Sequence, residues 1–292
     1  MTTRATAPVV PRDRRLEKSR RTLELVLDTL FRPASWAAKL AYVTRLSGRI
    51  ELSTLEVSTG RVASEARPSL RVAFASDFHA GPTTDRRLLA EACELLAALE
   101  PDVVLLGGDY VSVRAAYIDD LAPLIARIPA RLGKFGVLGN HDLRADYARV
   151  TRGLAAAGVR LLRNQSVRLE PPYDDMTICG LDDATRGRPD AETTFEGATA
   201  TRIALMHSPD GLLSIGDRPF ALALCGHTHG GQVVLPTGRA IYTPSGKLSR
   251  RYCQGVFDLG AGRTLLVTRG VGCSTLPVRA FAAPLVHLCL IS

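Results

Sequence analysis

Five short apolar runs, each followed at once by a compact polar motif, constrain the fold of this 292-residue chain more than any other feature. Apolar runs of this length, separated by segments of helical length, are typical of buried strands in a largely parallel sheet. In such sheets ligands bind in the crevice beyond the carboxyl ends of the strands, so we expect the motifs to meet there. The motifs are Asp77-Phe78-His79, Gly107-Gly108-Asp109, Gly139-Asn140-His141-Asp142, His207 and Gly226-His227-Thr228-His229.

Strands and helices alternate between residues 50 and 160, and strands dominate after residue 160. This order predicts an α/β domain with a substantially parallel, buried sheet. The helices are expected over 86–99, 121–128 and 147–157. The strands are expected over 70–75, 103–106, 135–138, 160–162, 167–169, 176–179, 203–206, 222–224, 231–235, 255–258, 264–268 and 285–291.

The spacing within the motifs suits metal binding. Asp77 and His79 are separated by one apolar residue, and side chains two apart in an extended segment point the same way, so both can face one ion. His227 and His229 repeat this spacing. Five of the six histidines lie in these motifs, whereas His287 lies in an apolar run and is expected to be structural. The collected imidazole and carboxylate groups indicate a two-metal hydrolytic centre.

The positive charge of the chain belongs to its N-terminal part. The net charge is +8, but residues 1–50 hold 11 Lys and Arg against 4 Asp and Glu, and the rest of the chain holds the remaining 26 against 25. A basic arm suits an anionic surface such as lipid headgroups or nucleic acid, and a solvated tail is the alternative. The nearly neutral body and an aromatic content of 5% argue against a surface that tracks nucleic acid.

The arm contains an expected amphipathic helix. Residues 1–15 are rich in Pro, Arg and Thr and are expected to be disordered, whereas residues 16–30 have an apolar face and a charged face. The charged face holds Arg20, Arg21, Glu24 and Asp28. Pro33 should break or restart the helix before a second segment at 36–43. Residues 16–43 can therefore lie on a membrane surface, or their apolar stripe can pack on the body of the protein.

Cysteine usage favours a cytoplasmic protein. The six cysteines form no CxxC pair and most lie in apolar runs, which is typical of reduced, buried thiols. No run of 18 apolar residues is present, so no transmembrane helix is expected. The stretch 19–23 faintly resembles a twin-arginine export signal, but acidic residues interrupt the apolar region that should follow. We therefore expect a cytoplasmic location, with peripheral attachment at the inner membrane face as an option, rather than export.

The motifs DxH, GD, GNHD, H and GHTH, in this order, resemble those of the calcineurin-like metallophosphoesterases. The resemblance covers residues 50–292. Segments 226–232 and 269–279 are similar to those of the bacterial branch that includes the YkuE and YaeI phosphodiesterases, with Cys273 as a departure. The resemblance implies a four-layer α/β/β/α sandwich of the metallo-dependent phosphatase type at 50–292, preceded by the basic arm at 1–49.

The resemblance also implies a dinuclear metal site. Its ligands are imidazole, carboxylate and carboxamide groups, a set that suits Mn, Fe or Zn better than Ca. The first ion would bind Asp77, His79 and His229, and the second would bind Asn140, His207 and His227, with Asp109 between them.

By the same resemblance, a metal-bridging hydroxide attacks phosphorus and His141 protonates the leaving oxygen. Asp142 is a candidate for orienting His141. Two divalent ions, two aspartates and one hydroxide leave a single positive charge, which matches a phosphodiester monoanion better than a phosphomonoester dianion. We therefore expect phosphodiester or pyrophosphate substrates, and a lipid-linked nucleotide sugar such as UDP-2,3-diacylglucosamine is the narrower hypothesis.

Two other functions stay open. A nuclease could use the basic arm to bind nucleic acid, although the nearly neutral body makes nucleic acid a weaker expectation. A metal-stabilised binding protein would keep the ligands without catalysis, although the presence of His141 argues against it. Four arginines are weaker candidates for clamping a phosphate: Arg186, Arg188, Arg269 and Arg279.

Overall fold

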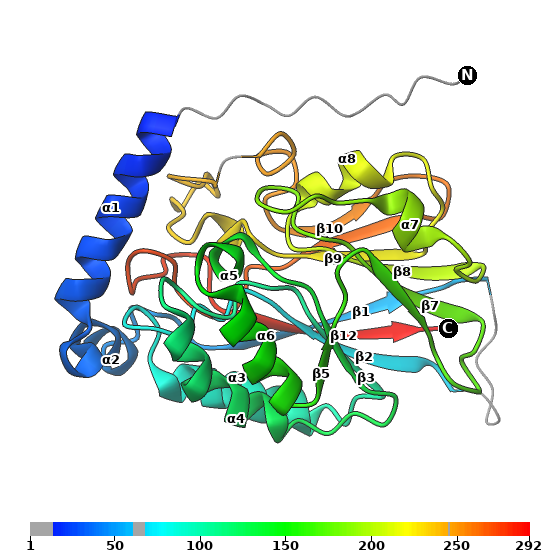
Figure 1. The fold of residues 1–292 in the computed structure, drawn as a ribbon, viewed down its shortest axis with the longest axis horizontal. Helices are drawn as coiled ribbons and strands as arrows, with labels where there is room; N and C mark the ends of the chain where they lie inside the picture. The colour runs from blue at the N-terminus through cyan, green and yellow to red at the C-terminus, as the bar shows by residue number, and fades with distance from the viewer. Residues whose placement is uncertain (1–13, 61–67, 245) are drawn as a thin grey trace.

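Two six-stranded sheets pack face to face in the computed structural model, which describes residues 14–60, 68–244 and 246–292 (Figure 1). The first sheet has the strand order β1-β12-β2-β3-β4-β5, and the strands from β2 to β5 are parallel. Its strands are β1 (Glu51–Val57), β2 (Leu70–Ala75), β3 (Val103–Leu106), β4 (Lys134–Gly136), β5 (Val159–Leu161) and β12 (Leu285–Ile291).

The second sheet has the strand order β10-β11-β9-β8-β7-β6. Its four central strands are parallel, and the outer strands β10 and β6 are antiparallel to their neighbours. Its strands are β6 (Gln165–Arg168), β7 (Met176–Gly180), β8 (Thr201–Leu205), β9 (Leu222–Cys225), β10 (Gly255–Asp258) and β11 (Thr264–Val267).

Helices cover the outer face of each sheet. The helices α3 (Arg86–Ala98), α4 (Ile118–Ala126) and α6 (Tyr147–Ala156) pack on the first sheet, and the short α7 (Ala191–Phe195) and α8 (Leu212–Ile215) lie on the second. Between the sheets, buried apolar side chains such as Phe74, Ile178 and Leu222 form a common core. The structure therefore confirms the predicted four-layer α/β/β/α sandwich.

Burial on both faces explains why the strands read as apolar runs. Every residue of β3, β7 and β9 is buried, as expected for strands with a packed layer on each side. Edge strand β1 is not predicted by the pattern, because most of its residues are exposed and carry little apolar signal. It pairs in parallel with β12.

The expected strand at 231–235 is wrong. A 3-10 turn at His229–Gly231 begins this segment, and isolated β-bridges rather than a named strand follow it. Gly230 and Gly231 both have positive φ angles, which turn the chain away from an extended path.

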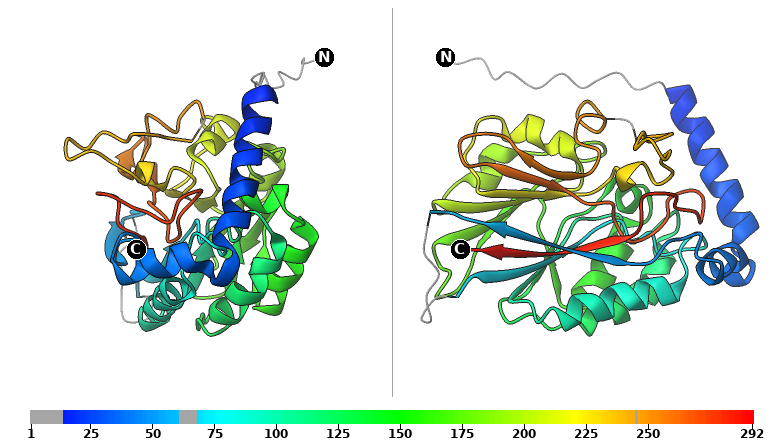
Figure 2. Two further views of the ribbon diagram at one scale, coloured as in Figure 1. Left: turned by 90° about the vertical axis from the view of Figure 1, so that its left-hand side faces the viewer. Right: turned by 180° about the vertical axis from the view of Figure 1, so that it is seen from behind.

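The N-terminal arm forms two helices at one end of the sandwich, and the first of them stands upright in the left view of Figure 2. Helix α1 (Arg14–Phe31) is followed by a 3-10 turn at Pro33–Ser35 and by α2 (Trp36–Val43), so the break at Pro33 is confirmed. Residues 14 and 15 belong to α1, and the remainder of the segment predicted to be disordered lies outside the described residues. Within the described ranges, no helix is long and apolar enough to cross a membrane.

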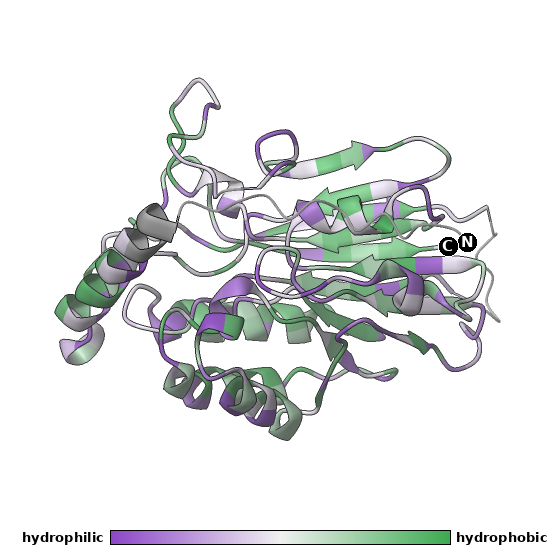
Figure 3. Ribbon diagram, turned by 45° about the horizontal axis from the view of Figure 1, so that its top comes forward, coloured by the Kyte–Doolittle hydropathy of each residue, from purple (hydrophilic) through white to green (hydrophobic). Residues whose placement is uncertain are grey.

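Helix α1 lies with its charged face inward. Glu24 and Asp28 are 6% and 2% exposed, whereas Leu23, Val26 and Leu30 are 52%, 56% and 57% exposed. Figure 3 shows hydrophobic residues, in green, along this helix. The predicted amphipathic pattern is present, but the alternative in which its apolar stripe packs on the body is wrong, because the acidic residues form ion pairs with arginines of the domain instead.

Candidate metal centre

The polar motifs meet where the carboxyl ends of strands from both sheets adjoin, as the strand pattern predicts. The side chains brought together are all buried. Segments after β2, β3 and β4 contribute Asp77, His79, Asp109, Asn140 and His141, the last two from the start of a short helix, and segments after β8 and β9 contribute His207, His227 and His229.

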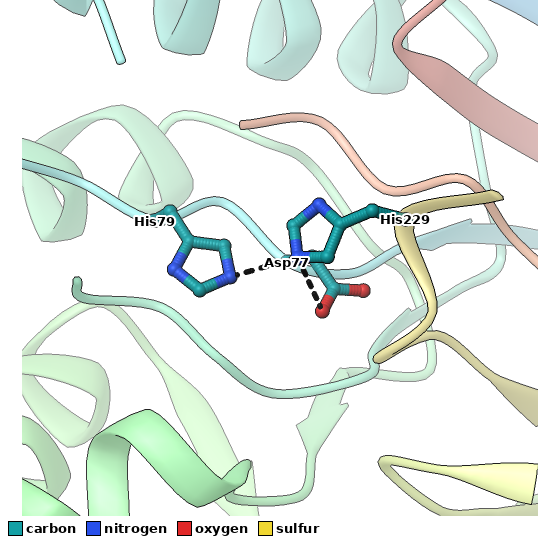
Figure 4. A group of neighbouring side chains, drawn as sticks. All are labelled: Asp77, His79 and His229. Carbon is teal, nitrogen blue, oxygen red and sulfur yellow. Dashed lines mark hydrogen bonds and ion pairs between the residues drawn. The ribbon is translucent and has the colours of Figure 1, made fainter. Parts of the chain in front are cut away.

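Asp77, His79 and His229 form the first cluster. The Nε2 atoms of His79 and His229 are 3.0 Å apart, and Nε2 of His229 is 3.6 Å from Oδ1 of Asp77. Figure 4 shows the three side chains converging from the loop after β2 and the loop after β9. One ion could therefore be held between groups from both sheets.

The second cluster gathers around His207. Its Nε2 atom lies 3.2 Å from Oδ2 of Asp109, 3.2 Å from Oδ1 of Asn140 and 3.2 Å from Nδ1 of His227. The same Oδ2 atom of Asp109 is 3.6 Å from Nε2 of His79 in the first cluster. Asp109 therefore stands between the two clusters, in the position expected for a bridging carboxylate.

The donor set of the second cluster fits a metal ion. The Nδ1 atom of His207 lies 2.8 Å from the carbonyl oxygen of Gly107 and donates its proton there, so the lone pair of Nε2 faces the carboxylate of Asp109. Burial lowers the pKa of His207, but the carboxylates of Asp109 and Asp77 outweigh burial and raise it well above its ordinary value. The site thus favours positive charge at this point, and a divalent cation would supply it.

The metal-binding motifs adopt an unusual backbone conformation. Asp77, His79, Asp109, His227 and His229 have φ angles of 55°, 44°, 53°, 72° and 53°. These left-handed conformations are uncommon outside glycine and concentrate at functional sites. The expectation of extended backbone within the two pairs is therefore wrong. Asp77 and His79 do reach one cluster, whereas His227 and His229 lie in different clusters.

Two glycines are required by close contacts with the aspartates. A Cβ atom on Gly226 would lie 2.0 Å from Oδ2 of Asp77, and one on Gly139 would lie 2.2 Å from Oδ1 of Asp109. No side chain fits at either position without displacing a carboxylate.

His141 lies beside the first cluster, with its ring edge against that of His79. Its Nδ1 atom is 2.6 Å from the carbonyl oxygen of Ser112, so Nδ1 donates a hydrogen bond and Nε2 is the atom left for proton transfer. Burial lowers the pKa of His141, and Asp109 opposes this effect. The geometry suits an acid that delivers a proton within a closed site.

Asp142 does not contact the His141 ring among its hydrogen bonds in the described part of the chain. Its two oxygens accept backbone N–H groups from Asp109, Tyr110, Val111 and Gly139, at 2.8, 2.9, 3.2 and 2.9 Å. The prediction that Asp142 orients His141 is therefore wrong, because the carbonyl of Ser112 orients the ring. Asp142 instead stabilises, through backbone hydrogen bonds, the turns that carry Asp109 and Asn140.

The four candidate arginines separate in the structure. Arg279 is buried, with Nη2 3.3 Å from Nδ1 of His229 and further hydrogen bonds to backbone carbonyls. Arg269 pairs with Glu51 at the sheet edge. The backbone N–H groups of Arg186 and Arg188 bind aspartates of their own loop. Arg279 is therefore the one of the four placed against a predicted ligand.

Sequence reasoning missed the contribution of the N-terminal arm to the site. Glu24, Leu27 and Asp28 of α1 line one cavity together with His79 and His141. The helical pattern could not reveal this contribution, because it does not show that Glu24 and Asp28 pair with Arg144 and Arg114 of the domain.

Comparisons with known proteins point to one family. The family model described as calcineurin-like phosphoesterase matches residues 70–231. The chain is similar to the phosphodiesterase YaeI of Escherichia coli, at 32% identity over 69% of this chain and 75% of that protein. It is also similar to the uncharacterized metallophosphoesterase YkuE of Bacillus subtilis, at 35% identity over 63% and 66%. A third relative is the UDP-2,3-diacylglucosamine pyrophosphatase LpxG of Chlamydia trachomatis, at 26% identity over 70% and 78%.

Proposed function

This chain belongs to the calcineurin-like phosphoesterase family and is a metal-dependent phosphoesterase, and we propose that it hydrolyses phosphodiester or pyrophosphate bonds. The observation that carries the proposal is the pair of buried ligand clusters joined through Asp109. Two adjacent clusters of this kind suit two metal ions that act together on one phosphoryl group.

In this proposal the ligands divide as the clusters do. Asp77, His79 and His229 would hold one ion, and Asn140, His207 and His227 would hold the other, with Asp109 between the two sets. When bound, such ions supply a hydroxide nucleophile at neutral pH and withdraw charge from the phosphoryl oxygens. The identity of the metal among Mn, Fe and Zn stays a prediction.

His141 provides the proton for the leaving oxygen. The hydrogen bond from Nδ1 to the Ser112 carbonyl fixes the orientation of the ring, so Nε2 is the nitrogen that carries the transferable proton when the ring is an imidazolium. Burial excludes bulk water from this proton, which keeps the transfer directed to the substrate.

Charge and relatives favour a diester or a pyrophosphate over a monoester. The expected centre carries a single positive charge, which a phosphodiester monoanion neutralises. YaeI is named as a phosphodiesterase and LpxG as a UDP-2,3-diacylglucosamine pyrophosphatase. A lipid-linked nucleotide substrate is the narrower form of the proposal.

The arm supports peripheral membrane contact through residues 16–43. Exposed apolar side chains lie along both helices: Leu23, Val26, Leu30, Trp36, Leu40 and Val43. Two of the four acidic residues among the first 50 are buried in ion pairs, so the outward charge of the arm is more basic than its composition suggests. An apolar stripe with basic flanks is the pattern of helices that lie in an anionic lipid surface. A cytoplasmic location, at the inner membrane face, stays part of this proposal.

The membrane contact can be tested by sedimentation with vesicles. The full chain should bind vesicles that contain anionic lipid, and Val26→Ser with Leu30→Ser should lose most of that binding. Leu213→Ser, at an exposed leucine of α8, is the matched control. Equal binding by all three proteins would remove the membrane contact from the proposal.

The reaction can be tested with bis-(p-nitrophenyl) phosphate beside p-nitrophenyl phosphate. Metal-stripped protein would be reloaded with Mn, Fe or Zn, and Asp109→Asn would serve as the inactive control. Metal-dependent cleavage of the diester, lost in the variant, supports the proposal. Two bound ions without cleavage of the diester or of a pyrophosphate ester would favour a binding protein. Steeply salt-dependent DNA binding would favour a nuclease.

A further inference from the structure

Helix α1 closes the cavity beside the metal centre. The cavity between α1 and the domain has a volume of about 20 Å³, and its walls include Glu24, Leu27, Asp28, His79 and His141. A volume of this size holds roughly one water molecule. A phosphoryl group with its ester oxygens is larger, so α1 has to move before such a group can enter this cavity.

Asp28, which lines this cavity, is anchored by the guanidinium group of Arg114 and the hydroxyl group of Tyr117. Its Oδ2 atom accepts a hydrogen bond from Nε of Arg114 at 2.7 Å, and its Oδ1 atom accepts one from the hydroxyl of Tyr117 at 2.9 Å. Arg114 follows the Ser112-Val113 segment, which lines the cavity and holds the ring of His141. The carboxylate of Asp28 therefore occupies an anion-binding position next in the chain to the segment that holds His141, the predicted general acid.

Glu24 is anchored in the same way on the other side. Its Oε2 atom accepts a hydrogen bond from Nη1 of Arg144 at 3.1 Å. Arg144 lies on α5 (Asn140–Arg144), the helix that carries Asn140 and His141. Arg114 and Arg144 thus both bind carboxylates that α1 supplies.

These ion pairs hold α1 in place together with Phe31, while most of its apolar stripe stays exposed. Leu23, Val26 and Leu30 face away from the domain, and the buried part of α1 among residues 21–31 is made by Glu24, Asp28 and Phe31. Guanidinium groups bind carboxylates and phosphates with the same geometry, so a phosphate could replace these carboxylates.

We propose that Arg114, Tyr117 and Arg144 form a second anion subsite, which binds the non-reacting phosphate of a pyrophosphate substrate and which Glu24 and Asp28 of α1 occupy in its absence. This inference rests on the proposed function and narrows it from phosphodiesters in general to substrates with two linked phosphates. The reacting phosphate binds at the metal centre, and the second phosphate displaces the carboxylates of α1 and binds the two arginines in their place. A diester with one phosphate has no second anionic group that could bind at this subsite.

The test compares two ligands that cannot be hydrolysed, because their phosphorus atoms carry no ester bond. Methylenediphosphonate has two ionised phosphonate groups, and methylphosphonate has one. Their affinities for the metal-loaded full chain are measured by isothermal titration calorimetry for the wild type and for Arg114→Gln, Arg144→Gln and Glu24→Gln/Asp28→Asn. Arg149→Gln is the matched control, because Arg149 forms an exposed ion pair with Asp119 outside the cavity.

Loss of one charge-assisted hydrogen bond should weaken binding of the diphosphonate by about tenfold or more in each arginine variant. Binding of the monophosphonate should stay within about twofold of the wild type, as should both ligands in Arg149→Gln. The Glu24→Gln/Asp28→Asn variant should bind the diphosphonate more tightly, because the competing carboxylates are gone.

Two results would overturn the subsite. Equal affinity of the diphosphonate for the wild type and both arginine variants would show that the arginines do not contact it. A parallel gain for both ligands in the arginine variants would show that the arginines only fasten α1. Because calorimetry reads binding without turnover, a wild type that binds the diphosphonate but cleaves no diester or pyrophosphate would count against the proposed function alone.

Discussion

Replacing Asp142 by Asn should destabilise the protein more than it alters the chemistry. The buried carboxylate accepts four backbone N–H groups, two at each oxygen. In Asp142→Asn one oxygen becomes an amide NH₂ group, and the two N–H groups facing it lose their acceptor. Each buried donor left without an acceptor costs about 1–3 kcal/mol, so we expect a loss of roughly 2–6 kcal/mol. That is a large part of the total stability of about 5–15 kcal/mol that folded proteins have.

Guanidinium chloride unfolding of the metal-free protein measures this loss. Asp190→Asn is the matched control, because Asp190 caps α7 through the N–H of Thr193 and should cost about 1 kcal/mol or less. The pH profile of diester hydrolysis is the second assay. The carbonyl of Ser112 orients the ring of His141, so the fall in activity at high pH that reports deprotonation of His141 should occur at the same pH in Asp142→Asn as in the wild type. A variant as stable as the wild type with a displaced basic limb would refute the reasoning.

Three further predictions follow from the same structure. Burial lowers the pKa of His287 to about 4, so below the ordinary value of about 6.5 the unfolded chain binds a proton at this residue more readily than the folded chain does. The free energy of unfolding should therefore fall by up to roughly 3 kcal/mol between neutral pH and about pH 4, and guanidinium chloride unfolding of His287→Gln at both pH values should show a smaller fall. His141→Gln should lower kcat for a diester by about 10²–10⁴-fold with unchanged metal content, as measured by turnover and metal analysis; unchanged kcat would exclude it as the acid. Gly226→Ala should push the Asp77 carboxylate out of the first cluster and reduce bound metal, whereas Gly238→Ala, where nothing lies within 4 Å, should retain both ions.

The arrangement of the centre could be predicted from the sequence because it depends on the ends of strands. Strands at 70–75, 103–106, 255–258 and 285–291 have the predicted bounds. Parallel strands deliver their carboxyl ends to one edge, so short motifs at those ends are brought together whatever the details of the loops. Local patterns therefore sufficed to place the predicted ligands close to one another.

The orientation of the arm and the role of Asp142 could not be predicted in this way. Helical spacing shows that α1 has two faces, but which face is buried depends on Arg114 and Arg144, which are about 90 to 120 residues away in the chain. Likewise, Asp142 stands next to His141 in sequence, yet its acceptors serve backbone groups of a different loop. Both cases depend on partners that only the tertiary fold supplies.

The centre draws its ligands from two sheets, and the packing between those sheets sets the spacing of the ligand clusters. Asp77 and Asp109 follow strands of the first sheet, whereas His207 and His229 follow strands of the second. A slide of one sheet over the other would change the separation of these groups directly. The side chains of the common core, such as Phe74 and Ile178, therefore help to set the distance between the two ligand clusters. A change of volume in this core should be felt as a change in metal spacing, even where the fold itself survives.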